Sequence, residues 1–311
     1  MRSLLLGGGG FIGSALARRL VAEGHAVTVV DDFSRGARDR LPSGCRIIPL
    51  DVRLPGWRIG MRNESWDWLF GLAGVVGVPN VVRAPFHTWE VTTETVRAML
   101  EIPAGKMFFA STSEIYGGQA PIPTSEAAPA SVPDLSHPRA VYAVAKMWGE
   151  VGLAHSGRPY VIGRFHNIYG PRMGQDHVIP LFCAQLLKQD GPLHVDDPTA
   201  VRAFCYVDDA VEAIVRLMEH AANATVNIGN PEEPVTMLDL MTRLRAVAGQ
   251  DGREIVTGGA EGFPRVRQPE IGRLVALTGF QPRVGLDEGL ARTFAAYAGD
   301  ERREKTAPRG N

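Results

Sequence analysis

The run Ser3-Leu4-Leu5-Leu6-Gly7-Gly8-Gly9-Gly10-Phe11-Ile12-Gly13 near the N-terminus decides the fold of this chain. Its apolar residues predict a buried strand, and its glycines at 7, 10 and 13 allow a tight turn. Ile12, Leu16 and Leu20 then recur at helical spacing. In such a turn, backbone N–H groups can approach a pyrophosphate at the helix N-terminus. A strand, a glycine turn and a helix in this order therefore predict a dinucleotide-binding unit.

A second apolar stretch, Ala26–Val30, predicts the next strand and is followed directly by Asp31. An acid about 20 residues past the glycine turn is placed to accept a hydrogen bond from a ribose 2′-hydroxyl. That carboxylate would repel a 2′-phosphate, so we expect the cofactor to be NAD rather than NADP. Arg35 and Arg38 lie nearby in the sequence and leave NADP open as an alternative.

Strand and helix patterns alternate through the first half of the chain, which predicts βαβ units and a parallel sheet. The further strands are expected at Arg46–Leu50, Asp67–Leu72, Lys106–Ala110 and Tyr160–Arg164, and the helices notably at Thr92–Glu101 and Tyr142–His155. We therefore expect an α/β fold of the Rossmann type, with a doubly wound parallel sheet.

The pattern loosens after about residue 170 and predicts a smaller α/β lobe that binds the substrate. Its expected elements are the helices Val178–Lys188, Asp208–His220, Thr236–Ala248 and Leu286–Ala298 and the strand Thr225–Ile228. We expect residues 1–170 to form the NAD-binding domain, with later segments returning to it. Residues 171–299 would form mainly the substrate-binding lobe, and residues 300–311 a disordered tail.

Composition excludes several classes of function. The formal net charge is −1, so nothing indicates a nucleic-acid or membrane-surface partner. No uninterrupted apolar run is long enough to cross a membrane. The three cysteines, Cys45, Cys183 and Cys205, are scattered and show neither a disulfide framework nor metal-ligand spacing. We therefore expect a cytoplasmic protein without a metal site.

Hydroxyl and carboxyl groups follow one of the expected strands. Ser111-Thr112-Ser113-Glu114 comes directly after the apolar residues 107–110, and ligands bind at the carboxyl ends of parallel strands. Tyr142 and Lys146 are four residues apart and share one helix face. An ammonium beside the phenol would lower the pKa of the tyrosine from about 10. This set suits removal of an alcohol proton while hydride leaves the same carbon for NAD.

These motifs together resemble the extended short-chain dehydrogenase/reductases, the family of nucleotide-sugar epimerases, dehydratases and decarboxylases. The resemblance runs from Leu4 to about Tyr297. It implies catalytic roles for Thr112, Tyr142 and Lys146. The cofactor contacts that it implies lie at Gly7, Gly10, Phe11, Ile12, Gly13, Asp31, Asp51, Val52, Leu72, Ala73, Tyr142 and Lys146.

The same resemblance implies a nucleotide-diphosphate sugar as substrate. In the family, an asparagine that touches the substrate diphosphate falls on Asn167, and a phosphate-binding arginine falls on Arg202. Ser113, Arg172 and Arg267 lie in motifs of the same substrate site. Many relatives dimerise through two helices per subunit, so the resemblance also implies a homodimer.

Members of the family share an opening step, in which Tyr142 would take the proton of the sugar 4-hydroxyl while C4 gives hydride to NAD. A 4-epimerase then returns hydride to the other face, a 4,6-dehydratase first eliminates water, and a uronate decarboxylase first loses carbon dioxide. Glu114 is typical of the dehydratases and decarboxylases. Residues 226–233 and the segment Arg267-Gln268-Pro269-Glu270-Ile271 resemble UDP-glucuronate decarboxylases, whereas Ala143-Val144-Ala145 is closer to epimerases.

The best expectation is therefore decarboxylation of a nucleotide-linked glucuronate, with catalytic residues Thr112, Glu114, Tyr142 and Lys146. A 4-epimerase and a 4,6-dehydratase remain alternatives. A non-catalytic NAD-binding protein is a fourth possibility, which the intact Thr112, Tyr142 and Lys146 disfavour. The sequence leaves open the nucleotide base and the sugar.

Overall fold

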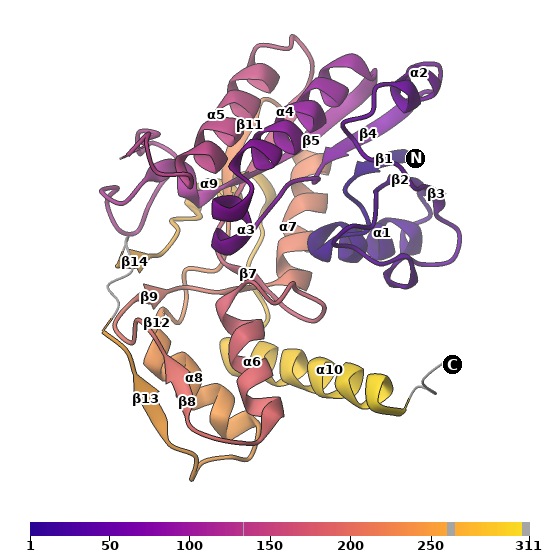
Figure 1. Ribbon diagram of the computed structural model, residues 1–311. Helices are drawn as coiled ribbons and strands as arrows, with labels where there is room; N and C mark the ends of the chain where they lie inside the picture. The colour runs from indigo at the N-terminus through magenta and orange to yellow at the C-terminus, as the bar shows by residue number, and fades with distance from the viewer. Residues whose placement is uncertain (133, 260–264, 307–311) are drawn as a thin grey trace.

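The computed structural model describes residues 1–132, 134–259 and 265–306, the last six as backbone only. Its centre is a seven-stranded sheet in the order β11-β6-β5-β4-β1-β2-β3, in which every pairing is parallel (Figure 1). The strands are β1 (Arg2–Leu6), β2 (Ala26–Val30), β3 (Arg46–Ile48), β4 (Trp66–Gly71), β5 (Ala104–Thr112), β6 (Tyr160–Phe165) and β11 (Ala224–Ile228). The predicted doubly wound sheet is confirmed.

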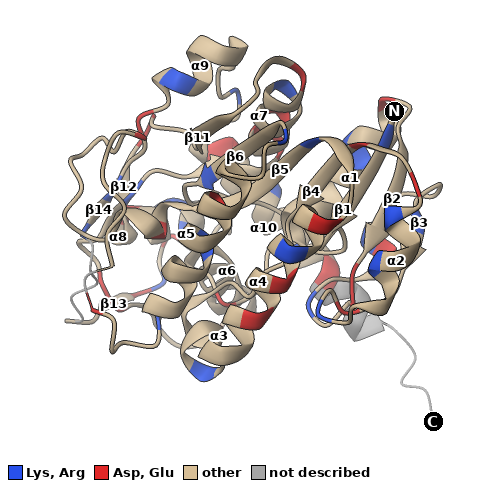
Figure 2. Ribbon diagram, turned by 90° about the horizontal axis from the view of Figure 1, so that it is seen from above, with Lys and Arg blue, Asp and Glu red and all other residues tan. Residues whose placement is uncertain are grey.

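Helices cover both faces of this sheet, so its strands bury side chains on both sides. Leu5 and Phe108 pack toward a core shared with α1 (Phe11–Ala22) and α7 (Val207–His220). Their neighbours Leu6 and Phe109 point to the opposite core, as the two-residue period of a strand requires. That core is completed by α2 (Gly56–Arg62), α4 (Pro85–Glu101) and α5 (Ala140–Ala154), and α3 (Val78–Arg83) precedes α4. Figure 2 shows α4 and α5 on one side of the strands and α1 and α7 on the other.

A smaller lobe lies beyond the carboxyl ends of the strands (Figure 1). It contains α6 (Val178–Lys188), α8 (Met237–Val247) and α10 (Leu286–Thr306), with the short strands β8 (Leu193–Val195), β9 (Val201–Arg202), β12 (Val235–Thr236), β13 (Ile255–Thr257) and β14 (Val266–Arg267). A two-stranded pairing of β7 (Ile168–Tyr169) with β10 (Cys205–Tyr206) leads into it. The chain returns to the main sheet through α7, β11 and α9 (Gly272–Thr278).

The largest change at the start of a predicted helix is in α4. Helix α4 starts at Pro85 rather than Thr92, with proline in its first turn. Its buried threonines at 88, 92 and 95 each donate their hydroxyl to the carbonyl four residues earlier. These hydrogen bonds satisfy the buried hydroxyls. The threonines also interrupt the apolar pattern of the sequence, so the first part of the helix was not predicted.

Helix α10 continues to Thr306, so it includes residues 300–306 of the segment expected to be a disordered tail. The residues there are mainly arginine, glutamate and lysine, good helix formers that extend a helix already nucleated by the packed part before it. Residues 307–311 lie outside the described residues.

Within the described residues, no helix is both long and apolar enough to cross a membrane, and no group of histidine, cysteine and acidic side chains is arranged to hold a metal ion. Cys45, Cys183 and Cys205 are free thiols.

Helix α5 approaches β5 closely at Gly149, which gives a test of this packing. A Cβ at position 149 would lie 2.6 Å from Cζ of Phe109, whereas at Gly152 its nearest neighbour would be 3.6 Å away. Gly149→Ala should therefore lower the free energy of unfolding by about 1–3 kcal/mol. Gly152→Ala, the matched control, should raise it by up to about 1 kcal/mol through helix propensity. Denaturant unfolding of both variants measures the difference, and equal stabilities would contradict the packing of α5 on β5.

Candidate active site

Two connected cavities open at the carboxyl ends of the central strands, as expected for a doubly wound sheet. The smaller has a volume of about 310 Å³ and the larger about 600 Å³. Both are lined by Gly7, Gly10 and Leu72, so they meet above the glycine turn after β1 and the end of β4.

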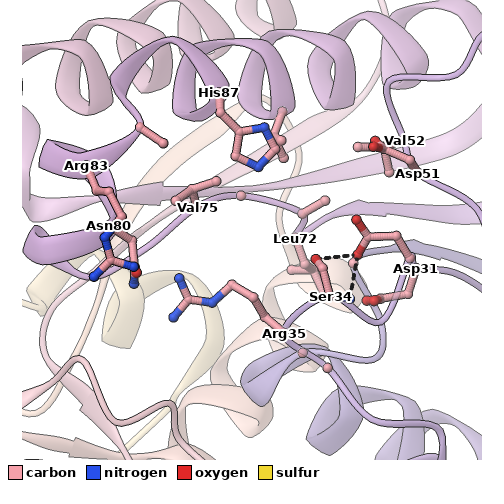
Figure 3. A pocket seen from close by; sticks show the side chains of 18 residues that line it. Asp31, Ser34, Arg35, Asp51, Val52, Leu72, Val75, Asn80, Arg83 and His87 are labelled. Carbon is pink, nitrogen blue, oxygen red and sulfur yellow. Dashed lines mark hydrogen bonds between the residues drawn. The ribbon is translucent and has the colours of Figure 1, made fainter.

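The smaller cavity has the features of a dinucleotide site. Gly7 has φ of +83°, and a Cβ there would lie 2.4 Å from the backbone nitrogen of Ala73, so only glycine lets the turn approach the end of β4. Figure 3 shows Asp31, Asp51 and Val52 at one end of this cavity and Asn80 and Arg83 at the other.

Asp31 occupies the position predicted for a ribose ligand. Its buried carboxylate accepts hydrogen bonds of 2.8 Å from the N–H groups of Gly9 and Phe33, which fix it beside the glycine turn. Burial raises its pKa, and these two hydrogen bonds lower it in part. The turn, the acid and the cavity together fit the adenosine half of NAD. All the cofactor residues predicted from the sequence line one of the two cavities.

The larger cavity brings together the predicted catalytic and substrate residues. Thr112 ends β5, and its hydroxyl accepts the N–H of Glu114 at 3.2 Å, which starts the short helix η2 (Ser113–Tyr116). Tyr142 and Lys146 enter from α5. The other residues of the set that line it are Ser113, Glu114, Asn167, Arg172, Arg202 and Arg267.

Lys146 lies over the ring of Tyr142, as expected for two residues on one helix face, but its ammonium donates to a backbone carbonyl and not to the phenol. The Nζ atom of Lys146 donates to the carbonyl of Ala110 at 2.7 Å and lies 5.8 Å from the centroid of the Tyr142 ring. Burial raises the pKa of Tyr142 to about 12, although a hydrogen bond with Thr112 lowers it in part. The predicted fall in the tyrosine pKa is therefore wrong for this structure. At Tyr142 the effect of desolvation on the pKa outweighs that of the hydrogen bond. Desolvation also lowers the pKa of Lys146 to about 8.

Glu114 lies between two arginines. Arg139 Nη2 donates to both carboxylate oxygens of Glu114, at 2.8 and 2.9 Å, and Arg267 Nη1 donates to one of them. Burial alone would raise the pKa of Glu114, but Arg267 and then Arg139 outweigh it and lower the pKa to about 2. Sequence reasoning missed Arg139, for which the only signal was its place one helical turn before Tyr142.

A buried polar network lies behind the catalytic residues. Arg164 on β6 holds Glu150 on α5 through two hydrogen bonds, at 3.0 and 2.7 Å, and Ser111 donates to the same carboxylate. Arg164 also donates to the phenol of Tyr116, which in turn donates to Asn227. The network joins β5, α5, β6 and β11 and so fixes the face of α5 that carries Lys146.

Two residues that line the larger cavity, Asn167 and Arg202, are those predicted to bind the substrate diphosphate. Asn167 has a left-handed backbone, with φ of +43°, and its side-chain amide donates to the carbonyl of Ala203 at 3.0 Å. Arg202 donates to the carbonyls of Val201 and Arg265, at 2.8 and 3.1 Å. Burial, followed by the nearby Arg267, lowers the pKa of Arg202 to about 10, so it stays cationic at neutral pH.

Comparison with known proteins agrees with this geometry. The model of the NAD dependent epimerase/dehydratase family matches residues 3–229. The chain belongs to this family. It is therefore an enzyme whose cofactor is NAD, and the family expected from the motifs is confirmed.

Two curated relatives are decarboxylases by name. UDP-N-acetyl-alpha-D-glucosaminuronate decarboxylase of Bacillus cytotoxicus is 32% identical over 313 residues, covering 94% of this chain and 96% of that protein. UDP-glucuronic acid decarboxylase 1 of Xenopus tropicalis is 30% identical, covering 94% and 71% respectively. A solved UDP-glucose 4-epimerase of Thermotoga maritima, with UDP-glucose, superposes with a TM-score of 0.87 at 26% identity, covering 97% of this chain and all of that one.

The position of Asp31 predicts the choice between NAD and NADP. We expect the wild-type protein to bind NAD much more tightly than NADP, because a carboxylate there favours a ribose 2′-hydroxyl over a 2′-phosphate. Asp31→Asn keeps the shape of the side chain and removes its charge, so the ratio of the two dissociation constants should fall. Isothermal titration calorimetry with both cofactors tests this. Equal affinities in the wild-type protein would rule out this role for Asp31.

Proposed function

We propose that this enzyme decarboxylates a nucleotide-linked glucuronate. The observation that carries the proposal is the placement of Arg139 and Arg267 around Glu114 in the larger cavity. Two guanidinium groups at one point suit the recognition of a second carboxylate, such as C6 of a uronate, because arginine binds carboxylates through paired charge-assisted hydrogen bonds. The neutral hydroxymethyl group of a hexose would make no use of this charge.

Tyr142, Thr112 and Lys146 would carry out the opening step, which is oxidation of the sugar at C4. NAD, when bound, supplies the reversible acceptance of hydride from the sugar C4. Tyr142 would take the hydroxyl proton, and the hydrogen bond from Thr112 favours its phenolate form. Lys146, with a pKa of about 8, would remain largely cationic at neutral pH beside this ring.

Loss of carbon dioxide would follow because the oxidised sugar is a β-keto acid. The carboxyl carbon C6 is attached to C5, next to the C4 ketone, so carbon dioxide leaves with the electrons of the C5–C6 bond delocalised into an enolate. C5 then takes a proton. Glu114 would orient the guanidinium groups around the uronate, since its low pKa keeps it ionised at neutral pH.

The contacts of Glu114 also disfavour dehydration. Arg139 donates to both carboxylate oxygens and Arg267 to one of them, so the carboxylate is already engaged and poorly placed to take a C5 proton. Epimerisation stays the second candidate. The apolar residues 143–145 and the similarity to the Thermotoga maritima epimerase favour it.

We place the nucleotide diphosphate of the substrate against Asn167, Arg172 and Arg202, with residues 171–299 as the main substrate-binding lobe. The names of the two decarboxylase relatives support a UDP-linked uronate, either plain or with a 2-acetamido group. The free thiols of the three cysteines suit a reducing compartment, and we propose that the enzyme works in the cytoplasm.

Glu114→Gln tests the proposed reaction. It keeps the shape of the side chain but leaves two guanidinium groups without their anion, so turnover of UDP-glucuronate should fall on the order of 10²-fold or more. C4 oxidation depends on Tyr142 and not on Glu114. NADH absorbance should therefore still appear in the variant, and a 4-keto sugar should accumulate. Glu288→Gln, which alters an exposed carboxylate paired with Arg292 on α10, is the control and should leave the rate unchanged. An unchanged rate in Glu114→Gln would contradict the proposed decarboxylation and would favour 4-epimerisation.

We further propose that the enzyme is a homodimer formed through α4 and α5. Lys146 and Glu150 are the only charged residues of α5, and both are buried, so the exposed face of this helix is uncharged. That face presents Trp148, 41% exposed, and Val151, 60% exposed. An apolar helix face of this kind is typical of a protein interface.

The helix pair predicts the effect of one substitution on assembly. The wild-type protein should be a dimer by multi-angle light scattering at micromolar concentration. Trp148→Asp should be monomeric, because a charge would be buried in an apolar interface. Leu135→Asp, on an exposed loop residue, serves as control and should remain dimeric. A monomeric wild-type protein would end the dimer proposal.

A further inference from the structure

Arg35 lies between the two cavities. It belongs to the loop that follows β2, and it lines the smaller cavity as well as the larger one. The N–H of Ala37 donates to the carbonyl of Gly9 at 3.3 Å, which ties this loop to the glycine turn. Of the described residues, Arg35 is the one cation that lines both cavities.

Two other loops, with Val76 and Asp176, hold the Arg35 guanidinium in place. Its Nη1 donates to the carbonyl of Val76 at 3.0 Å, and its Nη2 donates to Asp176 at 2.7 Å. Asn80 donates to the same two acceptors, to Val76 at 3.0 Å and to Asp176 at 2.7 Å. Asp176 thus anchors the side chains of Arg35 and Asn80, which come from the loop after β2 and from α3. Figure 3 shows the Arg35 side chain extended across the cavity toward Asn80.

We propose that Arg35 binds the diphosphate of NAD and that Asp176 is the residue that positions it. A dinucleotide whose adenosine half occupies the smaller cavity must cross into the larger one above Gly7 and Gly10, where Arg35 stands. A guanidinium has five N–H donors in a planar fork, and the two hydrogen bonds to Val76 and Asp176 leave donors for phosphate oxygens. The charge is pre-positioned, so little side-chain entropy is lost on binding.

Two other phosphates fit Arg35 less well. A 2′-phosphate on the adenosine ribose would lie beside Asp31, at the opposite end of the smaller cavity from Asn80, whereas Arg35 extends toward Asn80 (Figure 3). The substrate diphosphate is assigned to Asn167 and Arg202, which line the larger cavity but not the smaller one. The inference therefore concerns the cofactor and is independent of which sugar the enzyme converts.

The test compares ligands with and without phosphates. Arg35→Gln should weaken binding of NAD and of ADP on the order of tenfold to a hundredfold, as expected for a lost charge-assisted hydrogen bond. Its affinity for adenosine, which has no phosphate, should stay unchanged. Calorimetry with NAD and ADP and an NMR titration with adenosine measure these affinities. Arg38→Gln is the matched control, since Arg38 lies over the ring of Phe33, 5.3 Å from its centroid, and lines neither cavity.

Asp176→Asn tests the positioning role. It should weaken ADP binding less than Arg35→Gln, and it should have little further effect when combined with that substitution, because it acts through Arg35. Equal losses for adenosine and ADP in Arg35→Gln would mean that the residue only supports the fold of the cavity and would overturn the proposal. Unchanged ADP affinity, or a loss for UDP in place of ADP, would also overturn it. None of these results depends on the sugar chemistry, so they separate this inference from the proposed function.

Discussion

The charge of Glu114 between Arg139 and Arg267 is the constraint on which the catalytic end of this structure depends. A half-buried carboxylate is costly unless it is paired, and here its partners come from the start of α5 and from β14 in the smaller lobe. The pairing therefore joins the end of β5, the helix of Tyr142 and Lys146, and the substrate lobe. If one partner were lost, the other charges would be left unbalanced in the same cavity.

The parallel sheet brings the other groups to this point. Polar residues follow β5 and β6 at the edge where parallel strands end, so Thr112 and Asn167 open into one cavity although they are distant in sequence. The residues of helix α5 have three different roles. Tyr142 and Lys146 line the cavity, Gly149 packs against Phe109, and Trp148 and Val151 face outward.

Much of this could be predicted from the sequence, because it is encoded locally. The glycine turn, the acid after β2 and the tyrosine–lysine spacing are short-range patterns, and they identified the fold, the cofactor and the residues of the cavity. What could not be predicted depends on tertiary contacts. The pKa of Tyr142 rises because the folded chain buries its phenol, and no residue nearby in sequence reveals that burial. The roles of Arg139 and Asp176 depend on partners that lie 25 and 141 residues away in the sequence.

The central claim is that the paired guanidinium groups of Arg139 and Arg267 serve a uronate whose carboxyl group is lost. Its most direct test is to supply the enzyme with UDP-glucuronate and its 2-acetamido analogue, each labelled with carbon-13 at C6, in deuterated water. The account predicts labelled carbon dioxide and a UDP-pentose that carries one deuterium at C5. A product that keeps the carbon-13 label, whether its mass is unchanged or reduced by that of water, would contradict the account.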